Sequence, residues 1–387
     1  MAIDPSQPLL TPTPIFAEWA TAVDGERVPQ AVLLVGPEGA ELLPLALRMI
    51  AYAQCTDRRR DGETGAAEHC GECEGCRSHA RLVHPDVHFT FPVVGTGATS
   101  ADLLARWREE VLADPYLGQD AWLRAQTTDN KQGNINREEV MRILHDVALQ
   151  RFTSGYKTVL VWGADYLAAE SNRLLKIIEE PPARTLILLV TERPERILPT
   201  IASRCRLYRL PPPPPEAIAR LLRERGLPEA RAQEVAYAAG GNIAEALAAA
   251  AHAGQGADGG DGPDFAGWLR ACFSGRGAAI TQASAGLAKR TREEQKHFLR
   301  VGLRFARELG VALAGNPLPL KLSPPQREVA QKLARIVDWD QLAALSEELE
   351  ALLTAIERNA HPKIAFTASG VRIHRILAPD RAPAPLS

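Results

Sequence analysis

The chain has 387 residues, of which 45% are hydrophobic and 24% charged, and its formal net charge is −2. A chain of this length exceeds a single hydrophobic core, so we expect roughly two or three folded domains rather than a disordered or fibrous protein. Because 45 basic residues are balanced by 47 acidic ones, no overall field attracts the protein to nucleic acid or to an anionic membrane, and any DNA contact has to be local or supplied by partners.

Targeting and redox signals favour a cytoplasmic protein. Met1–Leu10 has no basic segment followed by an apolar stretch, and apolar runs such as Leu186–Val190 are far too short to cross a bilayer. The six cysteines are expected to be metal ligands or buried thiols, because disulfides are rare in the cytosol.

Three short apolar runs predict buried strands in the first half of the chain. Ala31–Val35 precedes a glycine-containing loop and a helix at Leu42–Ala53, and the other two runs are Thr158–Trp162 and Leu186–Val190. None of them alternates apolar and polar residues, so we expect a parallel sheet that helices cover on both faces. Residues 1–210 are therefore predicted to form an α/β domain.

Helices and spacers are predicted after the second strand. Ala168–Glu180 has helical spacing and ends before Pro181, because a residue that precedes proline is pushed out of helical geometry. The proline run Pro211–Pro215 predicts a stiff spacer and a domain boundary. Residues 216–252 then predict a small helical domain.

The last part of the chain is predicted to be helical. Gly254–Pro263 is rich in Gly and Asp and predicts a flexible linker. Residues 264–378 carry leucine and phenylalanine stripes at helical spacing, which indicate a packed helical domain. Residues 379–387 are rich in Pro and Ala and are expected to be disordered.

The loop after the first predicted strand lacks the groups of a phosphate-binding loop. When the pattern G-x-x-x-x-G-K-[ST] is started at Gly36, Glu41 replaces the last glycine, Leu42 the lysine and Leu43 the hydroxyl residue. We therefore expect no ATP hydrolysis and little or no ATP binding here. Taken alone, Gly36 and Gly39 are better explained as an ordinary turn, and other parts of the chain have to decide.

The second predicted strand lacks the acidic pair of an ATPase. In such enzymes an aspartate at its end helps to hold magnesium and a glutamate polarises the attacking water. Here the strand ends in Trp162-Gly163-Ala164, and Asp165 comes too late to replace the pair.

Two segments carry a specific resemblance to a known family. Ser171–Pro182 reads S-N-R-L-L-K-I-I-E-E-P-P, and Leu198–Cys205 reads L-P-T-I-A-S-R-C. Both are similar, in order and separation, to motifs of the AAA+ clamp-loader ATPases, and the resemblance extends over about residues 30 to 210. It implies an α/β AAA+ domain with a RecA-like parallel sheet, followed by a small helical lid domain and an all-α collar domain.

The resemblance also implies roles for individual residues. Arg204, preceded by Ser203, matches the family arginine that crosses a subunit boundary and contacts the γ-phosphate bound by the neighbour. For an isolated surface arginine the ordinary explanation is a solvated charge. Thr191 matches the sensor of the γ-phosphate and is expected to be a relic, whereas Ala244 stands where active members carry a second sensor arginine. Cys205 is expected to be a buried apolar residue rather than a nucleophile.

The losses and the surviving arginine together indicate a subunit type. Phosphate loop, acidic pair and second sensor are absent while Arg204 remains, which is typical of the delta-prime type of subunit in the DNA polymerase III clamp loader. The resemblance implies no ATPase or polymerase activity of its own, and no ATP at its own site. It implies tau/gamma motor subunits and a delta subunit as partners in a heteropentamer, which loads a sliding clamp on primed DNA during replication and contacts no membrane.

Two other interpretations stay open at this point. The chain could be an ATP-hydrolysing tau/gamma motor subunit, against which Leu42 argues. It could also be a zinc-bearing nucleic-acid-binding module unrelated to polymerases, which the near-zero net charge disfavours.

A cysteine cluster predicts a structural zinc site. Four thiolates are a complete tetrahedral set for zinc, and no water-bearing position or nearby catalytic acid is apparent. The gap before the second cysteine is longer than in the family, so His69 and His79 are alternatives for the fourth ligand. The predicted ligands are Cys55, Cys70, Cys73 and Cys76.

Two segments depart from the family pattern or match it weakly. Gly95–Asn130, with Trp107 and Trp122, is longer than the usual connection and is interpreted as a surface insertion of unknown role. Arg358–Lys363 resembles the end of the collar domain, although an ordinary turn between helices explains it equally well.

Overall fold

Residue contacts group the chain into two compact units. The first comprises residues 1–221 and 241–248, and the second residues 222–240 and 249–387. The finer division into sheet domain, lid and collar that the sequence predicts stays a prediction. The structure, a computed structural model, describes residues 9–11, 13–60, 66–95, 97–126, 133–253, 265–290, 292–315, 320, 322, 324–358 and 360–378. The predicted linker at 254–263 and the predicted disordered tail at 379–387 lie outside them.

The first unit is built on a five-stranded parallel sheet in the order β4-β5-β6-β1-β7. The three central strands are the predicted ones and are buried along their whole length, so the predicted α/β fold class is confirmed. The strands are β1 (Ala31–Val35), β4 (Val87–Thr90), β5 (Lys157–Trp162), β6 (Thr185–Thr191) and β7 (Arg206–Arg209).

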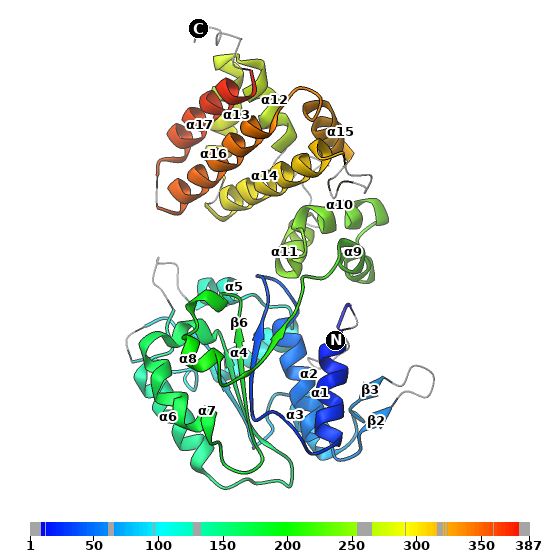
Figure 1. Ribbon diagram of the computed structural model, residues 1–387, viewed down its shortest axis with the longest axis vertical. Coiled ribbons are helices and arrows are strands. Elements are labelled where there is room, and N and C mark those ends of the chain that lie inside the picture. Colours follow the sequence, from blue (N-terminus) through cyan, green and yellow to red (C-terminus); the bar gives the residue numbers. More distant parts are fainter. Residues whose placement is uncertain are drawn as a thin grey trace. The chain divides into compact units, whose positions relative to one another are not determined.

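Helices cover both faces of this sheet, with α1, α2 and α3 on one side and α6, α7 and α8 on the other (Figure 1). Alternate strand residues enter two separate cores. Leu34 and Leu188 pack with α2, whereas Leu33 and Leu189 pack with Val140 of α6. This two-sided burial is the physical reason why the central strands carry continuous apolar runs, with polar residues confined to the ends of β5 and β6.

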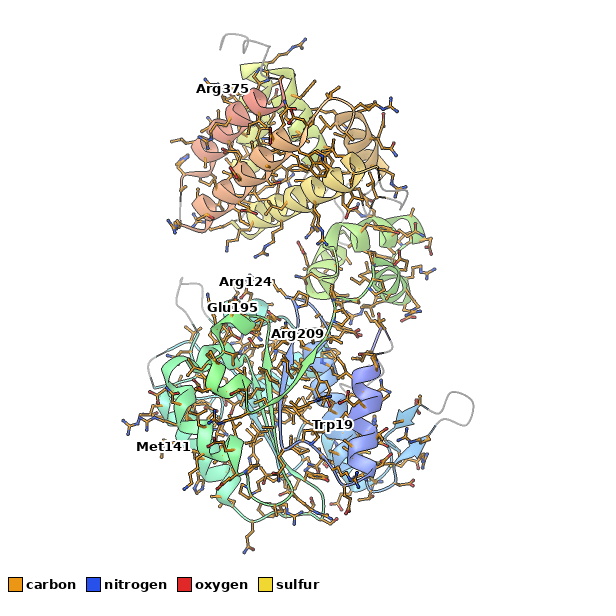
Figure 2. The ribbon with its side chains drawn as sticks, in the orientation of Figure 1. Trp19, Arg124, Met141, Glu195, Arg209 and Arg375 are labelled. Carbon is orange, nitrogen blue, oxygen red and sulfur yellow. The ribbon has the colours of Figure 1, made fainter. Side chains whose placement is uncertain are left out.

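The helices of the first unit vary from single turns to thirteen residues. Figure 2 places Trp19 inside the unit and Met141 at its outer surface, in agreement with their burial. The helices are α1 (Pro14–Asp24), α2 (Leu42–Gln54), α3 (Glu74–His79), α4 (Leu104–Ala113), α5 (Gln119–Gln126), α6 (Arg137–Ala148), α7 (Leu175–Glu179) and α8 (Pro199–Ala202), with 3-10 turns η1 (Ala164–Leu174) and η2 (Pro194–Arg196) and a hairpin of β2 (Arg59–Arg60) and β3 (Ala67–Glu68).

The helix predicted at Ala168–Glu180 differs in kind. Its first part belongs to the 3-10 segment η1, and α-helical geometry is confined to α7, which ends at Glu179. Helical spacing of apolar residues does not distinguish bonding to the third residue from bonding to the fourth, because both bring the same positions to one face. The end before Pro181 is as predicted.

The described residues of Gly95–Asn130 include a buried part, which the expected surface insertion did not foresee. Trp107 and Trp122 are fully buried in the core that also contains Leu34. The Trp107 ring stacks on Phe91 at 4.9 Å between centroids, and Trp122 Nε1 donates to the Pro92 carbonyl at 2.9 Å. Two large aromatic side chains bury enough apolar surface to outweigh the polar composition around them.

The second unit consists of helices, as predicted. Phe298, Phe305 and Leu309, on the predicted stripe of α14, are fully buried in its core with Phe265 and Phe366. Arg358–Lys363 spans the turn between α16 and α17, and Asn359 is outside the described residues. The helices are α10 (Glu229–Ala239), α12 (Phe265–Ser274), α13 (Gly277–Ala288), α14 (Arg292–Leu313), α15 (Pro324–Leu333), α16 (Trp339–Glu357) and α17 (Pro362–Leu377), while α9 (Pro215–Glu224) and α11 (Ile243–Ala253) contribute to both units.

Within the described part of the chain, none of the helices has both the length and the apolar character that crossing a membrane requires.

Candidate functional site

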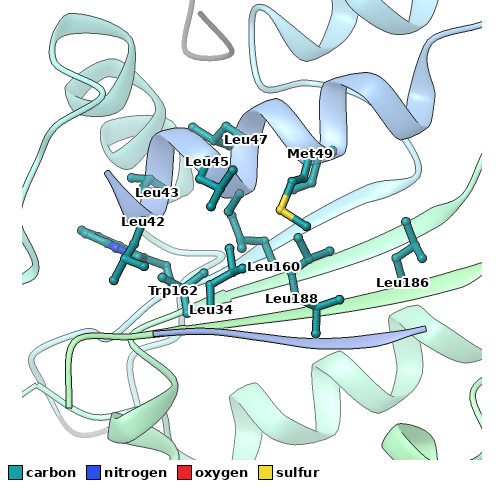
Figure 3. Packing of buried hydrophobic residues seen from close by; sticks show 14 of the residues in the cluster. Leu34, Leu42, Leu43, Leu45, Leu47, Met49, Leu160, Trp162, Leu186 and Leu188 are labelled. Atoms are coloured by element: carbon teal, nitrogen blue, oxygen red, sulfur yellow. The ribbon is translucent and has the colours of Figure 1, made fainter. Parts of the chain in front are cut away.

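The loop predicted to be a degenerate phosphate loop joins β1 to α2, and two buried leucines follow it at the start of α2. Leu42 and Leu43 form the first turn of α2 and are 2% and 3% exposed. Figure 3 shows Leu42 and Trp162 in the space between this turn and the carboxyl ends of the strands. Leu42, the residue at the predicted lysine position, is therefore part of the hydrophobic core.

Glu41 occupies the N-cap position of α2, where the helix dipole attracts negative charge. Its Oε1 accepts a hydrogen bond of 2.7 Å from the backbone N–H of Leu10. Burial raises the pKa of this carboxyl to about 7, although the N–H groups of Leu10 and Thr11 and the charge of Arg48 act in the opposite direction. A segment near the start of the chain thus covers the helix end at which a nucleotide phosphate would bind.

Asn242 closes the loop from another side. A Cβ atom at Gly39 would lie 2.0 Å from Asn242 Oδ1, and Gly39 has a φ of +74°. The N–H of Ile243 donates to the Gly39 carbonyl at 3.1 Å. Glycine is required here by close approach and backbone geometry together. The loop glycines are therefore explained by contacts within the chain.

The sensor position is also occupied by contacts within the chain. Thr191 ends β6 and is fully buried, and its Oγ1 donates to Asp165 Oδ1 at 2.8 Å. The same hydroxyl accepts from the backbone N–H of Arg193 at 2.9 Å. Arg193 Nη1 lies 3.8 Å from the other oxygen of Asp165. Asp165 thus holds the sensor threonine and a nearby arginine.

Acidic residues surround the carboxyl edge of the sheet next to this pair. Glu192 is half-buried, and its pKa is raised to about 8 because burial disfavours the charged form and because Glu38 and Asp120 repel it. Such an edge disfavours a triphosphate. Ala244 in α11, the residue predicted to stand at the second-sensor position, adds no positive charge, and its Cβ lies 3.6 Å from where a Cβ at Gly118 would be.

Arg204 lies toward the amino ends of the strands, whereas the phosphate loop follows the carboxyl end of β1. It precedes β7, whose Arg206 is level with Val32, whereas the phosphate loop begins at Gly36. Four strand residues separate those levels, which corresponds to about 13 Å along the strand. Arg204 therefore lies away from the loop of its own chain, just before the level at which β7 begins.

The Arg204 side chain has two partners among the described residues. Its Nε donates to Glu179 Oε1 at 2.5 Å, and its Nη1 donates to the Thr200 carbonyl at 2.8 Å. The side chain is 36% exposed. Ser203 is exposed and donates to the same carbonyl at 3.3 Å. Cys205 is half-buried, and burial raises the pKa of its thiol to about 11, which is unfavourable for a nucleophile.

The four predicted cysteine ligands lie together. Their sulfur atoms are all within 4.8 Å of one another. Tetrahedral coordination of zinc by thiolates at ~2.3 Å places the sulfurs about 3.8 Å apart, and Cys70 Sγ and Cys76 Sγ are 3.9 Å apart. The cysteines lie at the end of α2 and around the start of α3, and His69 and His79 do not join this group. The group is Cys55, Cys70, Cys73 and Cys76, and it could hold one metal ion.

Backbone N–H groups are directed at these sulfurs. Cys70 Sγ accepts from the N–H of Glu72 and of Cys73, and Cys55 Sγ accepts from the N–H of Cys70. Hydrogen bonds from the Cys76 thiol and the Cys70 N–H hold the pKa of Cys55 below its ordinary value. The turns thus favour thiolates, the form that binds metal.

A comparison with models of protein families shows to which family the chain belongs. The family model described as "DNA polymerase III, delta subunit" matches residues 12–214, more than half of the chain. The chain belongs to this family. The family membership excludes the alternative of a zinc module unrelated to polymerases.

Individual relatives agree with this family. The chain is 32% identical over 157 residues to the DNA polymerase III subunit delta' of Escherichia coli (strain K12), which covers 40% of this chain and 36% of that protein. It is 26% identical over 227 residues to the subunit delta' of Bacillus subtilis (strain 168), which covers 58% of this chain and 55% of that protein. The predicted kinship with delta' subunits is confirmed. The matches span about a third to just over half of these relatives.

The same region is also similar to a second type of subunit. The chain is 28% identical over 210 residues to the DNA polymerase III subunit gamma/tau of Mycobacterium tuberculosis (strain H37Rv), which covers 54% of this chain and 29% of that protein. Similarity to this subunit type therefore does not by itself separate the two predicted roles, and the residues of the loop have to do so.

Several residues of the site in this delta-family chain were not predicted from sequence. Leu10 and Asn242 close the loop, and Glu179 binds Arg204. Leu10 and Glu41 are 31 residues apart, and Glu179 and Arg204 are 25 apart. No local pattern connects such pairs, although Glu179 belongs to the E-E-P-P motif of residues 179–182.

Proposed function

We propose that the chain is the delta-prime stator of a DNA polymerase III clamp loader, without ATPase or polymerase activity of its own. The observation that carries this proposal is the combination of a loop filled by Glu41 and Leu42 with an exposed arginine, Arg204, near the opposite edge of the sheet. A subunit with this combination serves the nucleotide of a neighbour and not one of its own.

The loop supports the first half of the proposal. A nucleotide phosphate at the start of α2 would have to displace Leu10 from Glu41 and would meet a carboxyl instead of an amine. Leu42 offers no donor and is buried. Binding would therefore cost a hydrogen bond, expose apolar surface and bring like charges together.

Arg204 supports the second half. A guanidinium donates to phosphate oxygens in a fixed fork, and an arginine supplied in trans adds ~10³-fold or more to the rate of phosphoryl transfer. Glu179 and the Thr200 carbonyl accept hydrogen bonds from Nε and Nη1 and hold the guanidinium at the protein surface. The neighbour that fits this arrangement is an ATP-binding motor subunit of the tau/gamma type.

The cysteine group fits a structural zinc ion. Four thiolates complete a tetrahedral shell and leave no position for a reacting water, so the ion would stabilise the fold around α3 and take no part in chemistry. The sulfur separations and the N–H groups directed at Cys70 and Cys55 suit this ion.

The partners follow from the family. We assign the chain to a cytoplasmic heteropentamer with tau/gamma motor subunits and a delta subunit, in which the helices of residues 264–378 supply the collar. The complex would open a sliding clamp on primed DNA during replication. Contact with clamp and DNA would then be made through the complex.

Reconstitution tests this function. The full chain is mixed with tau/gamma and delta subunits, the complex is weighed by native mass spectrometry, and ATP turnover with clamp and primed DNA is measured. Arg204→Ala should leave the mass unchanged and lower turnover at its interface by ~10³-fold. The matched control is Arg206→Ala, which removes another exposed arginine, paired with Glu18, and should stay near wild type. Unchanged turnover in Arg204→Ala would refute the proposal.

An ATP-hydrolysing motor subunit is the second candidate, favoured by the similarity to gamma/tau. A nucleotide titration of the isolated chain separates the two. Saturable ATP binding, with turnover that changes in its own loop abolish, would establish the motor role. Absence of binding up to millimolar nucleotide would support the stator.

A further inference from the structure

Two hydrogen bonds hold the Arg204 guanidinium, and one of them is made by Nε, the nitrogen next to the aliphatic part of the side chain. Glu179, at the end of α7, binds Nε, and the Thr200 carbonyl of α8 binds Nη1. An arginine has five N–H donors, so these two contacts leave both donors of Nη2 and one of Nη1. Among the described residues, no hydrogen bond of Nη2 is found.

We infer that Glu179 is a positioning residue for Arg204, an inference that rests on the proposed function. Its carboxylate fixes the guanidinium through Nε, and the outer pair of nitrogens, Nη1 and Nη2, keeps a donor each for two oxygens of a terminal phosphate held by the neighbouring subunit. Arginine binds phosphate best through two parallel N–H groups. Glu179 leaves this pair available and sets its direction.

The contact between Glu179 and Arg204 restricts the arginine side chain but adds little to the stability of the folded chain. Arg204 is 36% exposed and Glu179 46% exposed, and an ion pair of this exposure stabilises a folded chain little. An arginine side chain, however, loses considerable rotamer freedom when it binds a ligand. Holding Arg204 beforehand removes part of that cost when the neighbour's phosphate arrives.

The place of Glu179 in the chain suits this role. The α-helix ends at Glu179, because Pro181 follows two residues later and the residue before a proline is pushed out of helical geometry. The carboxylate is thus held at a helix end that packs against α8, and Arg204 lies in the turn that follows α8. The next residue, Glu180, is exposed and carries the same charge. The described contacts of Arg204 do not include Glu180.

A carboxylate beside an arginine finger has a second possible effect. It also repels the phosphate, so it could restrain Arg204 until the nucleotide pulls it away. The two effects have opposite signs. Loss of a positioning contact lowers kcat, whereas loss of a restraint raises turnover or lowers KM. The contact through Nε and not through the outer pair of nitrogens favours positioning.

Three variants in the assembled complex test the inference. Glu179→Ala removes the acceptor, Glu179→Gln removes the charge but keeps an acceptor oxygen, and Glu180→Ala is the matched charge control. We expect Glu179→Ala to lower kcat for ATP about 10-fold with KM within about twofold. Glu179→Gln should keep most of kcat, and Glu180→Ala should equal wild type. In an Arg204→Ala background, Glu179→Ala should have no further effect.

Each outcome has a defined meaning. Wild-type kcat, or a faster reaction, in Glu179→Ala overturns the inference, as does a loss of the same size in Glu180→Ala. If Arg204→Ala itself is inactive while Glu179→Ala is normal, the proposed function stands and this inference alone fails. If Arg204→Ala is normal, the proposed function has failed. The mass of the complex and the melting temperature of each variant exclude a folding defect. If Glu179→Ala does not assemble, the kcat of Glu179→Gln tests the inference in its place.

Discussion

The Oγ1 atom of Thr191 donates a hydrogen bond of 2.8 Å to Oδ1 of Asp165, across two neighbouring strand ends of the sheet. Both side chains are buried, so the hydroxyl that would sense a phosphate in a motor subunit is bound within its own chain. The threonine therefore acts as a part of the fold.

Thr191→Val should destabilise the protein, because it removes a donor from a buried carboxylate and an acceptor from the N–H of Arg193. The expected loss is about 1–3 kcal/mol of unfolding free energy. Urea unfolding measures it. Thr21→Val, at an exposed position of α1, is the control and should change stability by less than about 0.5 kcal/mol. Equal stability of the two variants would contradict the structural role of Thr191.

Leu42→Lys should fail to create a nucleotide site. The new ammonium would lie in the core beside Trp162, and burying it without a partner should lower the unfolding free energy by at least about 2 kcal/mol. ATP titration should still show no binding. The matched control is Leu207→Lys in β7, where the leucine is 41% exposed, and the loss should be well under 1 kcal/mol. ATP binding by Leu42→Lys would show that the loop is open.

Glu41→Gln should change how stability depends on pH. The folded protein holds the pKa of Glu41 near 7, above the ordinary 4.5, so the folded state binds the proton more tightly than the unfolded chain. Its contribution is fully present below about pH 4.5 and is lost as pH rises toward 7. Glutamine keeps an acceptor for Leu10 and cannot ionise.

The difference between Glu41→Gln and wild type should therefore be small at pH 4.5 and grow to at most about 3 kcal/mol in favour of the variant by pH 8. Denaturant unfolding at a series of pH values measures it. Glu180→Gln, at an exposed position, should show no such trend. A pH-independent difference for Glu41→Gln would mean that the carboxyl titrates normally.

Removal of zinc should unfold the region around α3. A chelator should release one zinc ion per chain and lower the melting temperature, because the metal supplies the folding energy of such a module. Cys55→Ser should lose most of the zinc, measured by elemental analysis, whereas Cys205→Ser, outside the group, should retain it. Full zinc retention in Cys55→Ser would indicate a different fourth ligand.

Much of the fold was predictable because its signals are local. The strands β1, β5 and β6 are buried on both faces, and their central positions are therefore continuously apolar. The edge strand β7 was not predicted, since it is only four residues long and its two apolar residues, Leu207 and Tyr208, are flanked by Arg206 and Arg209. The η1 segment was predicted as an α-helix, because the two helix types share the spacing of their buried residues.

The amino-acid sequence by itself determined what is missing and what is retained: the lysine replaced by Leu42, the arginine at 204, and a cysteine spacing short enough to define a metal group. Only the tertiary structure decided that Leu10 covers Glu41 and that Glu179 holds Arg204. The physical reason is that the sequence states directly which residue stands at each position. A contact between residues 25 or more positions apart, in contrast, forms only once folding of the sheet has brought their elements together.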